Sequence, residues 1–231
     1  MRQLIAFCEG PTEQEFCARV LQPHLFPAGD GIIQPLPIGA KGPRHVFGLG
    51  RRSYGSMRRF IMDTIKHRDR REVTFTTLLD VYALPGDFPG KAALPRRRSG
   101  TKPDVRALET AFGGDVAHPR FVPNLMLHEF ETLLFADPRA FSVAFPDCEA
   151  AIGQLEAIAA SFPNVEHIDD GPSTAPSKRI IALLPRYEGR KASAGPAIAE
   201  RIGLRTIRAK CPHFDAWLTR LETLLGTGSA R

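Results

Sequence analysis

The 231-residue sequence predicts an α/β fold, with a mainly parallel sheet flanked by helices and a helical C-terminal extension. Short apolar runs that end in glycine, proline or acid are typical of strands buried on both faces. Amphipathic segments alternate with these runs up to Pro138, as in α/β proteins. Beyond that point apolar residues recur only at helical intervals. We therefore predict a core over residues 1–137 and an extension over residues 138–231 that packs on it.

The first elements are a strand, a tight turn and a helix. Leu4–Cys8 is a continuous apolar run and predicts the first strand. Thr12 is expected to cap the helix, with Glu15 as the capping-box partner three residues later, and Pro23 is expected to end it. Gly31–Ile38 predicts a second strand, placed at a sheet edge because it contains two prolines that cannot donate to a neighbour.

The remaining core elements follow the same alternation. Ser56–Arg70 carries an apolar stripe and predicts a helix. Val73–Tyr82, rich in β-branched and aromatic residues, predicts a central strand. Asp104–Phe112 predicts a short helix and Arg120–Leu127 another strand. The loop Ala83–Lys102 is long for a compact domain, and loops of that length usually have a function or are disordered.

Charge favours a polyanionic partner. The net charge is +6, and three basic clusters, "GRRSYGSMRRF", "KHRDRR" and "PRRRSGTK", lie in the first 102 residues. Such clusters suit the phosphates of nucleic acid. Solvated helix and loop faces are the alternative interpretation of any single cluster.

Cysteine usage and hydropathy restrict the class of protein. The four cysteines lack paired metal spacing, which argues against a zinc finger and favours reduced, buried thiols. The start of the sequence does not read as a signal peptide, and no apolar run reaches membrane-spanning length. We expect a cytoplasmic protein.

Three predicted strands end in acid, at Glu9, Asp80 and Glu129. In a parallel α/β sheet the carboxyl ends of the strands meet at one edge, where ligands bind. Neighbouring strands lie about 4.8 Å apart, so these side chains are expected to share one coordination shell. Bare carboxylates would repel one another. A hard divalent cation, Mg²⁺ or Mn²⁺, resolves that conflict.

Several segments carry a resemblance to a known family. "CEGPTE", "LLDVYALPGDFPG" and "LMLHEFETLLFADP" resemble the Toprim fold as found in the domain-of-unknown-function 4276 family, which is related to nuclease domains of overcoming-lysogenization-defect proteins. "TAPSKRIIALLPRY", "GPAIAERIGL" and "IRAKCPHFDAWLTRLE" extend the resemblance over nearly the whole chain. The resemblance implies a Rossmannoid Toprim core that binds magnesium for phosphoryl transfer on nucleic acid.

The resemblance also implies roles for individual residues. Glu9 matches the family's catalytic glutamate, and Asp80 matches the first acid of its Asp-x-Asp pair. Tyr82 stands where the second acid is expected. The missing metal ligand is then expected from Asp87, Glu129 or Glu131. Glu13 or His128 could relay protons, although a single histidine near a strand end is more often structural.

The phosphate is expected to contact basic side chains of the long loop and of the extension: Arg96, Arg97, Arg98, Lys102, Lys178 and Lys210. The resulting hypothesis is an Mg²⁺-dependent Toprim-type nuclease, acting on DNA rather than RNA. The resemblance implies a role in defence against foreign DNA together with an ATPase. That ATPase is expected to be a separate polypeptide, because this sequence has no phosphate-binding loop of the ATPase type.

Two other functions remain open. One is a non-catalytic module that binds nucleic acid or a protein partner, which Tyr82 favours. The other is phosphoryl transfer on a small phosphate such as a nucleotide, which the arginine-rich loop disfavours. "HEFETLLF" lacks a second histidine four residues after the first, so zinc proteolysis is not expected.

Overall fold

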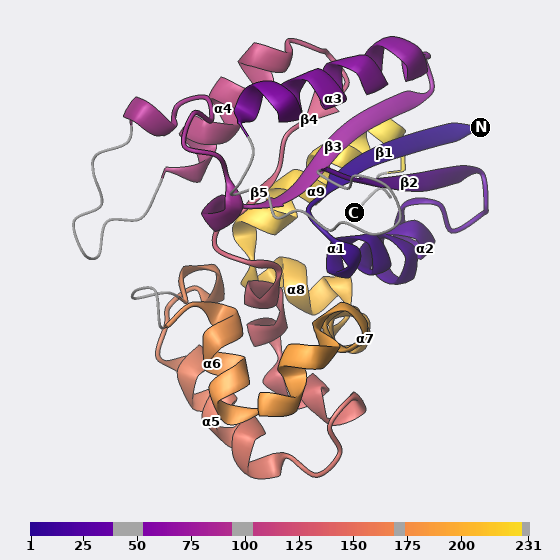
Figure 1. Cartoon of the computed structure of the whole chain (residues 1–231). Helices are drawn as coiled ribbons and strands as arrows, with labels where there is room; N and C mark the ends of the chain where they lie inside the picture. The colour runs from indigo at the N-terminus through magenta and orange to yellow at the C-terminus, as the bar shows by residue number, and fades with distance from the viewer. Residues whose placement is uncertain (39–52, 94–103, 169–173, 228–231) are drawn as a thin grey trace.

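The computed structural model of this chain describes residues 1–38, 53–93, 104–168 and 174–227 (Figure 1). Its centre is a five-stranded sheet in the order β2-β1-β3-β4, with β5 pairing β3 beyond the end of β4. Every pairing among these strands is parallel. The predicted α/β class with a mainly parallel sheet is confirmed, and the proline-containing strand β2 lies at an edge as expected. The strands are β1 (Arg2–Cys8), β2 (Gly31–Pro37), β3 (Val73–Asp80), β4 (Phe121–Val122) and β5 (Leu125–Met126).

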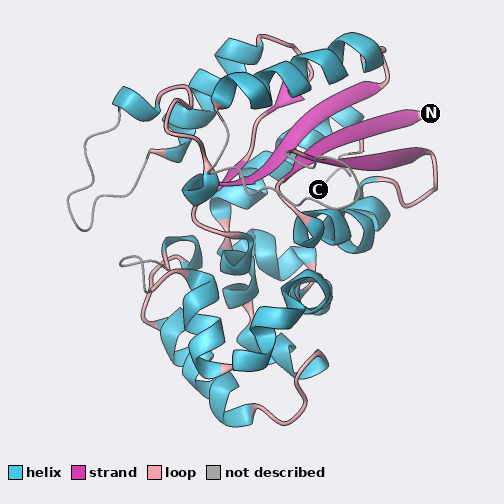
Figure 2. Cartoon of the chain, viewed as in Figure 1, coloured by secondary structure: helices cyan, strands magenta, loops and turns pink. Residues whose placement is uncertain are grey.

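Helices flank the sheet and make up the C-terminal part of the described chain (Figure 2). The α-helices are α1 (Pro11–Phe16), α2 (Gln22–Leu25), α3 (Tyr54–Arg68), α4 (Val105–Val116), α5 (Glu149–Ala160), α6 (Pro176–Leu183), α7 (Lys191–Ile202), α8 (Leu204–Lys210) and α9 (Pro212–Leu225). A π-helical turn, η1 (Cys17–Leu21), joins α1 to α2, and 3-10 turns include η6 (Phe130–Ala136), η7 (Pro138–Val143), η8 (Val165–His167) and η9 (Pro185–Arg190). None of the described helices has the length and apolar character needed to span a membrane.

Two hydrophobic cores form because side chains alternate along each strand. In β1, Ile5 and Phe7 belong to a core that packs against α3 and α4. Leu4, Ala6 and Cys8 point to the opposite face and join a larger core. The sheet is therefore buried on both faces, which explains why β1 reads as an uninterrupted apolar run.

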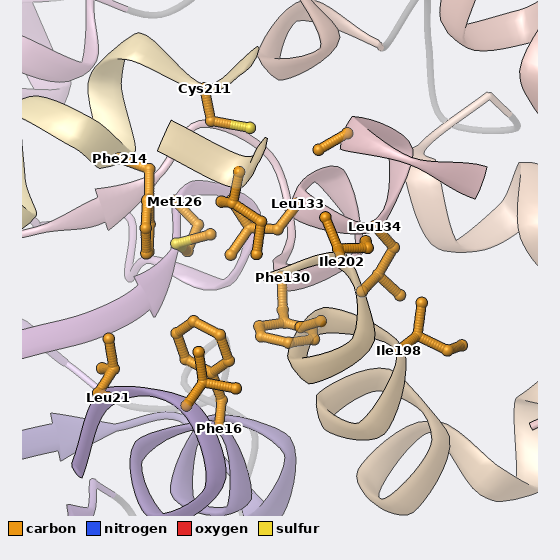
Figure 3. Close-up of a cluster of buried hydrophobic side chains, with 14 of the residues drawn as sticks. Phe16, Leu21, Met126, Phe130, Leu133, Leu134, Ile198, Ile202, Cys211 and Phe214 are labelled. Atoms are coloured by element: carbon orange, nitrogen blue, oxygen red, sulfur yellow. The ribbon is translucent and has the colours of Figure 1, made fainter. Parts of the chain in front are cut away.

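The larger core joins the sheet to the C-terminal helices. Figure 3 shows Phe130 of η6 between Phe16 of α1 and Ile198 of α7, and the Phe16 and Phe130 ring centroids lie 5.3 Å apart. At the other end of the chain, Trp217 of α9 donates a hydrogen bond from Nε1 to Thr76 Oγ1 on β3, at 2.8 Å. Side chains from both sides of residue 137 share this core. The division into two domains at that point stays a prediction.

The first helix differs from its predicted limits. Its N-cap is Gly10, and Glu13, not Glu15, reaches back so that Oε2 accepts from Gly10 N at 2.8 Å. Helical backbone also continues past Pro23, which lies in the first turn of α2. Proline is tolerated in a first helical turn, where its missing N–H has little to bond to, and the wider π-turn before it absorbs the irregularity. The predicted Thr12 cap and Pro23 stop are therefore wrong.

The predicted strand over residues 120–127 is divided into β4 and β5. The interruption falls at Pro123 and Asn124, because proline has no N–H to give to the ladder. Thr77 of β3 replaces the missing pairing with its side chain, whose Oγ1 accepts from Asn124 N and donates to Asn124 O, both at 2.8 Å. The chain thus remains alongside β3 as far as the carboxyl edge of the sheet.

Candidate active site

The carboxyl ends of β1 and β3 are joined through an acid. Glu9 follows β1 directly, and its backbone N donates to Leu78 O at 3.2 Å. Its side chain bends across to the next strand, where Oε2 accepts weakly from Asp80 N at 3.4 Å. Because Asp80 is level with Met126 in the parallel register, the segment after β5 reaches the same edge.

Five carboxylates gather at this edge: Glu9, Glu13, Asp80, Glu129 and Glu131. Burial raises the pKa of Asp80 well above its usual value, and the charges of the other four raise it further. Burial likewise raises the pKa of Glu9, with Glu129 and Glu131 adding to the effect, although the hydrogen bond from Asp80 N opposes it. The structure therefore brings together the three strand-end acids that the sequence singled out.

Glu13 is the acid whose protonation falls near neutrality. It is only 6% exposed, and burial raises its pKa to about 7, with Glu9 and Glu131 contributing. Backbone hydrogen bonds to the carboxylate, from Glu13 itself and from Gly10, oppose the rise. The Gly10 bond is made to Oε2. One residue thus holds the turn after β1 and contributes its charge to the acid group.

Asp80 has an oxygen that the protein does not satisfy. The residue as a whole is half-buried, but its Oδ1 is fully enclosed and has no hydrogen-bond partner in the part of the chain that the structure describes. A buried carboxylate oxygen without a donor or cation is costly, and such atoms are rare in folded proteins. The geometry therefore contains an acceptor position for which the protein itself provides no donor.

Two of the acids are held by the C-terminal helices. Glu129 Oε2 accepts from Ser177 N, at the start of α6, at 2.9 Å. Glu131 is 6% exposed, and its Oε1 lies 3.3 Å from Lys191 Nζ and 3.4 Å from the Tyr187 hydroxyl that donates to it. Burial raises the pKa of Glu131, and Lys191 partly offsets the rise. These two acids are therefore less available to a ligand than Glu9, Glu13 and Asp80.

A glycine allows α7 to approach the acids. A Cβ at Gly195 would lie 3.1 Å from both the Phe130 ring and the Tyr187 hydroxyl, which is tighter than ordinary packing.

The sequence analysis did not identify Ser177, Tyr187 or Lys191 as site residues. They lie about 45 to 60 positions from the acids they contact, and no local pattern marks them, so only the tertiary fold brings them to the site.

The other predicted site residues are placed differently. Asp87 Oδ1 accepts from Tyr54 N at the start of α3, at 2.8 Å, and is not among the charges that shift the pKa of Asp80. Its role as a metal ligand stays a prediction that this placement does not favour. Tyr82 and His128 lie against each other beside the acids, with ring centroids 5.5 Å apart.

Of the basic residues predicted to contact the phosphate, two lie in the described part of the chain and only one of these is near the acid group. Lys178 is exposed in the first turn of α6, next to Ser177 and hence near Glu129. Lys210 is exposed at the end of α8. Four more predicted contacts lie outside the described residues: Arg96, Arg97, Arg98 and Lys102.

The donor chemistry of the acid group suits a hard divalent cation. All five side chains offer carboxylate oxygen, which Mg²⁺ and Mn²⁺ prefer, and Asp80 Oδ1 lacks a donor. Within residues 1–38, 53–93, 104–168 and 174–227, however, no three His, Cys, Asp or Glu side chains are grouped so that they could hold an ion as they stand. Binding a cation therefore requires side-chain rotation that draws the oxygens together.

Comparison with known proteins defines the family. A family model described as Domain of unknown function (DUF4276) matches residues 8–222, which span the whole acid group, Lys191 and most of α9. The chain belongs to this family, as its sequence motifs predict. No curated protein and no solved structure matches it.

Proposed function

We propose that this chain is a metal-dependent phosphodiesterase of Toprim type that cleaves nucleic acid. The observation that carries the proposal is the convergence of strand-end acids around Asp80, whose buried Oδ1 has no donor in the described part of the chain. Burying carboxylates that lack donors costs free energy, and clusters of carboxylates with shifted pKa values are typical of functional sites. The net charge of +6 supports a polyanionic substrate.

The roles of the acids follow from their bonding. Glu9 and Asp80, with Glu129 after release from Ser177, would hold Mg²⁺ or Mn²⁺. When bound, the cation supplies Lewis acidity toward the phosphodiester and the attacking water. Glu13 has a pKa of about 7, so its carboxylate is suited to accept a proton from that water. Glu131, held by Lys191, keeps η6 and α7 together at the site.

Substitution of the two strand-end acids tests the proposal. Glu9→Gln and Asp80→Asn should each lower Mn²⁺- or Mg²⁺-dependent cleavage of labelled DNA or RNA by about 10³-fold or more, since loss of metal-held charge costs several kcal/mol in the transition state. Glu200→Gln, an exposed acid of α7 that pairs with Arg19, is the matched control and should cleave normally. The proposal fails if folded Glu9→Gln and Asp80→Asn proteins cut as fast as the control.

The resemblance to Toprim nucleases gives this proposal a context. We propose DNA rather than RNA as the substrate, and a separate ATPase as partner in defence against foreign DNA. We propose that a neighbouring gene encodes this ATPase, and supplying the purified chain with DNA, Mn²⁺ and that ATPase should give cleavage that depends on ATP. Cleavage of RNA in preference to DNA would reject this choice of substrate.

A second candidate is a non-catalytic module that binds nucleic acid or a protein partner. Two observations favour it: Tyr82 replaces the expected second acid, and no three described side chains are grouped to hold an ion. It predicts no heat of binding on titration with Mn²⁺. It also predicts nucleic-acid binding that weakens steeply with salt but is the same in the Glu9→Gln variant.

A further inference from the structure

A groove runs between α4 and α9 and begins beside the acids. Its first part, a hollow of about 270 Å³, is lined by Leu127 and His128, and His128 directly precedes Glu129. Its second part, about 550 Å³, continues along the two helices. Arg106 and His213 line both parts, so the two hollows lie next to each other.

The carboxylates along the groove are engaged by the protein's own donors. Glu166 is 3% exposed, and its two oxygens accept from His213 N at 2.8 Å and Phe214 N at 3.0 Å at the start of α9. Glu109 Oε1 accepts from Leu125 N at 2.8 Å and lies 3.0 Å from His213 Nε2. Asp104 caps α4 by accepting from Ala107 N at 3.0 Å. Glu166 is buried and Glu109 half-buried, whereas Asp104 is exposed, and each of the three accepts a backbone N–H of the protein.

The cations of the groove face solvent. Arg106 of α4 and Arg220 of α9 are both exposed and come from the two helices that border the groove. Neither makes an ion pair with a described residue. The same hollow is lined by Pro119, Pro123 and Trp217, whose indole is fixed by its bond to Thr76. Arginines on two walls above an apolar floor match a ligand that carries phosphates along its length and apolar rings between them.

We infer that this groove binds one strand of nucleic acid and leads it to the acid group. The statement that the groove leads the strand to the acid group rests on the proposed function, whereas binding of the strand in the groove does not. Hollows of a few hundred cubic ångströms accept ligands of nucleotide size. A duplex, with its bases paired inside and about 20 Å across, would bring only its outer phosphates to the two arginines and leave the apolar floor uncovered.

Binding without a metal tests the inference. The affinity of the chain for a short fluorescent oligothymidylate is measured by anisotropy in EDTA at several salt concentrations. Arg106→Gln/Arg220→Gln should bind about tenfold more weakly at low salt, and the slope of log affinity against log salt should fall by about 1.4, from two lost phosphate contacts. Arg201→Gln/Arg205→Gln removes the same charge from exposed sites on α7 and α8 and should behave as the parent.

A steric variant separates groove binding from general attraction. Ala216 is exposed on α9 and lines the groove, so Ala216→Phe fills the groove without changing charge. It should weaken binding by a similar factor, while Ala209→Phe, at an exposed position of α8, should not.

The outcomes distinguish this inference from the proposed function. If the parent cleaves with metal but both groove variants bind the oligonucleotide as the parent does, the inference that the groove binds nucleic acid is rejected and the proposed nuclease activity stands. If both groove variants bind more weakly but the parent does not cleave at any metal concentration, the inference about the groove stands and the proposed nuclease activity is rejected. Displacement of the oligonucleotide by polyglutamate or by duplex DNA at lower concentration than by unlabelled single strand would also overturn the inference, in favour of a protein partner or a duplex.

Discussion

The protein buries carboxylates in two neighbouring regions, and it provides hydrogen-bond donors for them in one region but not for all of them in the other. At the start of α9, Glu166 is 3% exposed, but both of its oxygens accept backbone N–H groups. At the end of β3, Asp80 has an enclosed Oδ1 without a described partner and is surrounded by four more acids. Burial raises the pKa of both residues, and only in Glu166 do backbone hydrogen bonds offset it.

Under the proposed function, the difference separates a structural acid from a functional one. Glu166 satisfies the free N–H groups of a helix N-terminus and connects η8 to α9, so its burial has a structural benefit. Asp80 has no comparable benefit, and its neighbours increase the cost of its charge. A group that the fold leaves unsatisfied is best explained by a ligand that satisfies it. The following substitutions test whether the two regions differ in this way.

Glu166→Ala should produce the largest loss of stability. Removing the carboxylate leaves two N–H groups of α9 without an acceptor, and the free energy of unfolding should fall by about 3 kcal/mol. Urea denaturation at neutral pH measures it. Glu149→Ala is the control, because Glu149 is exposed in the first turn of α5 and should lose only a few tenths of a kcal/mol. Equal losses in the two variants would contradict a structural role for Glu166.

The acid group should destabilise the metal-free fold as pH rises. The folded-state pKa of Glu13, about 7, lies above the usual value of 4.5 for a glutamate, so the native state binds more protons than the unfolded state between these values. Stability contributed by protonated Glu13 is therefore present below about pH 4.5 and lost as pH approaches 7, by up to about 3 kcal/mol.

Urea denaturation in EDTA at a series of pH values measures this loss. Glu13→Gln should remove much of the decline over that interval, while Glu15→Gln, two residues along the same helix, should retain it. Adding Mn²⁺ should restore stability at neutral pH, because ligation favours the charged carboxylates. A parent protein whose stability does not decline between pH 4.5 and 7 in EDTA would contradict the electrostatic account of this site.

Asp80→Asn should stabilise the metal-free protein, by about 1 kcal/mol near pH 8. The amide removes one charge from the group and adds an N–H that Glu9 or Glu13 can accept. Asp115 is the opposite case: partial burial raises its pKa, but hydrogen bonds from Tyr54 and Arg58 reverse the effect and leave the pKa lowered. Asp115→Asn should therefore destabilise. Thermal denaturation in EDTA compares the two, and a loss of stability in both would remove the distinction.

The sequence predicts the half of the site that strands build. Glu9, Asp80 and Glu129 could be found because parallel strands end at one edge, and acid at the end of an apolar run is a local signal. A continuous apolar run also predicts β1, β-branched and aromatic residues predict β3, and two prolines predict the edge position of β2. Prediction was poorer where local signals compete. Both Gly10 and Thr12 are plausible caps, and the choice depends on the position of Glu13 in the finished site.

The half built by the C-terminal helices could not be predicted. Lys191 follows Arg190 in a segment with no acid of the site nearby in sequence, and Tyr187 resembles any buried aromatic residue. Their contacts with Glu131 depend on the packing of α7 against η6, which involves residues far apart in the chain. Pairings of this kind are set by tertiary structure and leave no periodic pattern in the sequence.

Lys191→Met should give a small loss of stability, and it tests whether Lys191 offsets part of the negative charge of the acid group. Glu131 is buried, but the Lys191 side chain is 34% exposed, so solvent screening limits the expected loss of stability to about 1 kcal/mol near pH 8. Lys178→Met, at an exposed position of α6, should lose less. The Lys191→Met/Glu131→Gln double variant isolates the pair: if Lys191 acts through Glu131, Lys191→Met should cost almost nothing once Glu131 is neutral. If the two losses simply add, Lys191 stabilises α7 by packing alone, and the acid group has no internal counter-ion there.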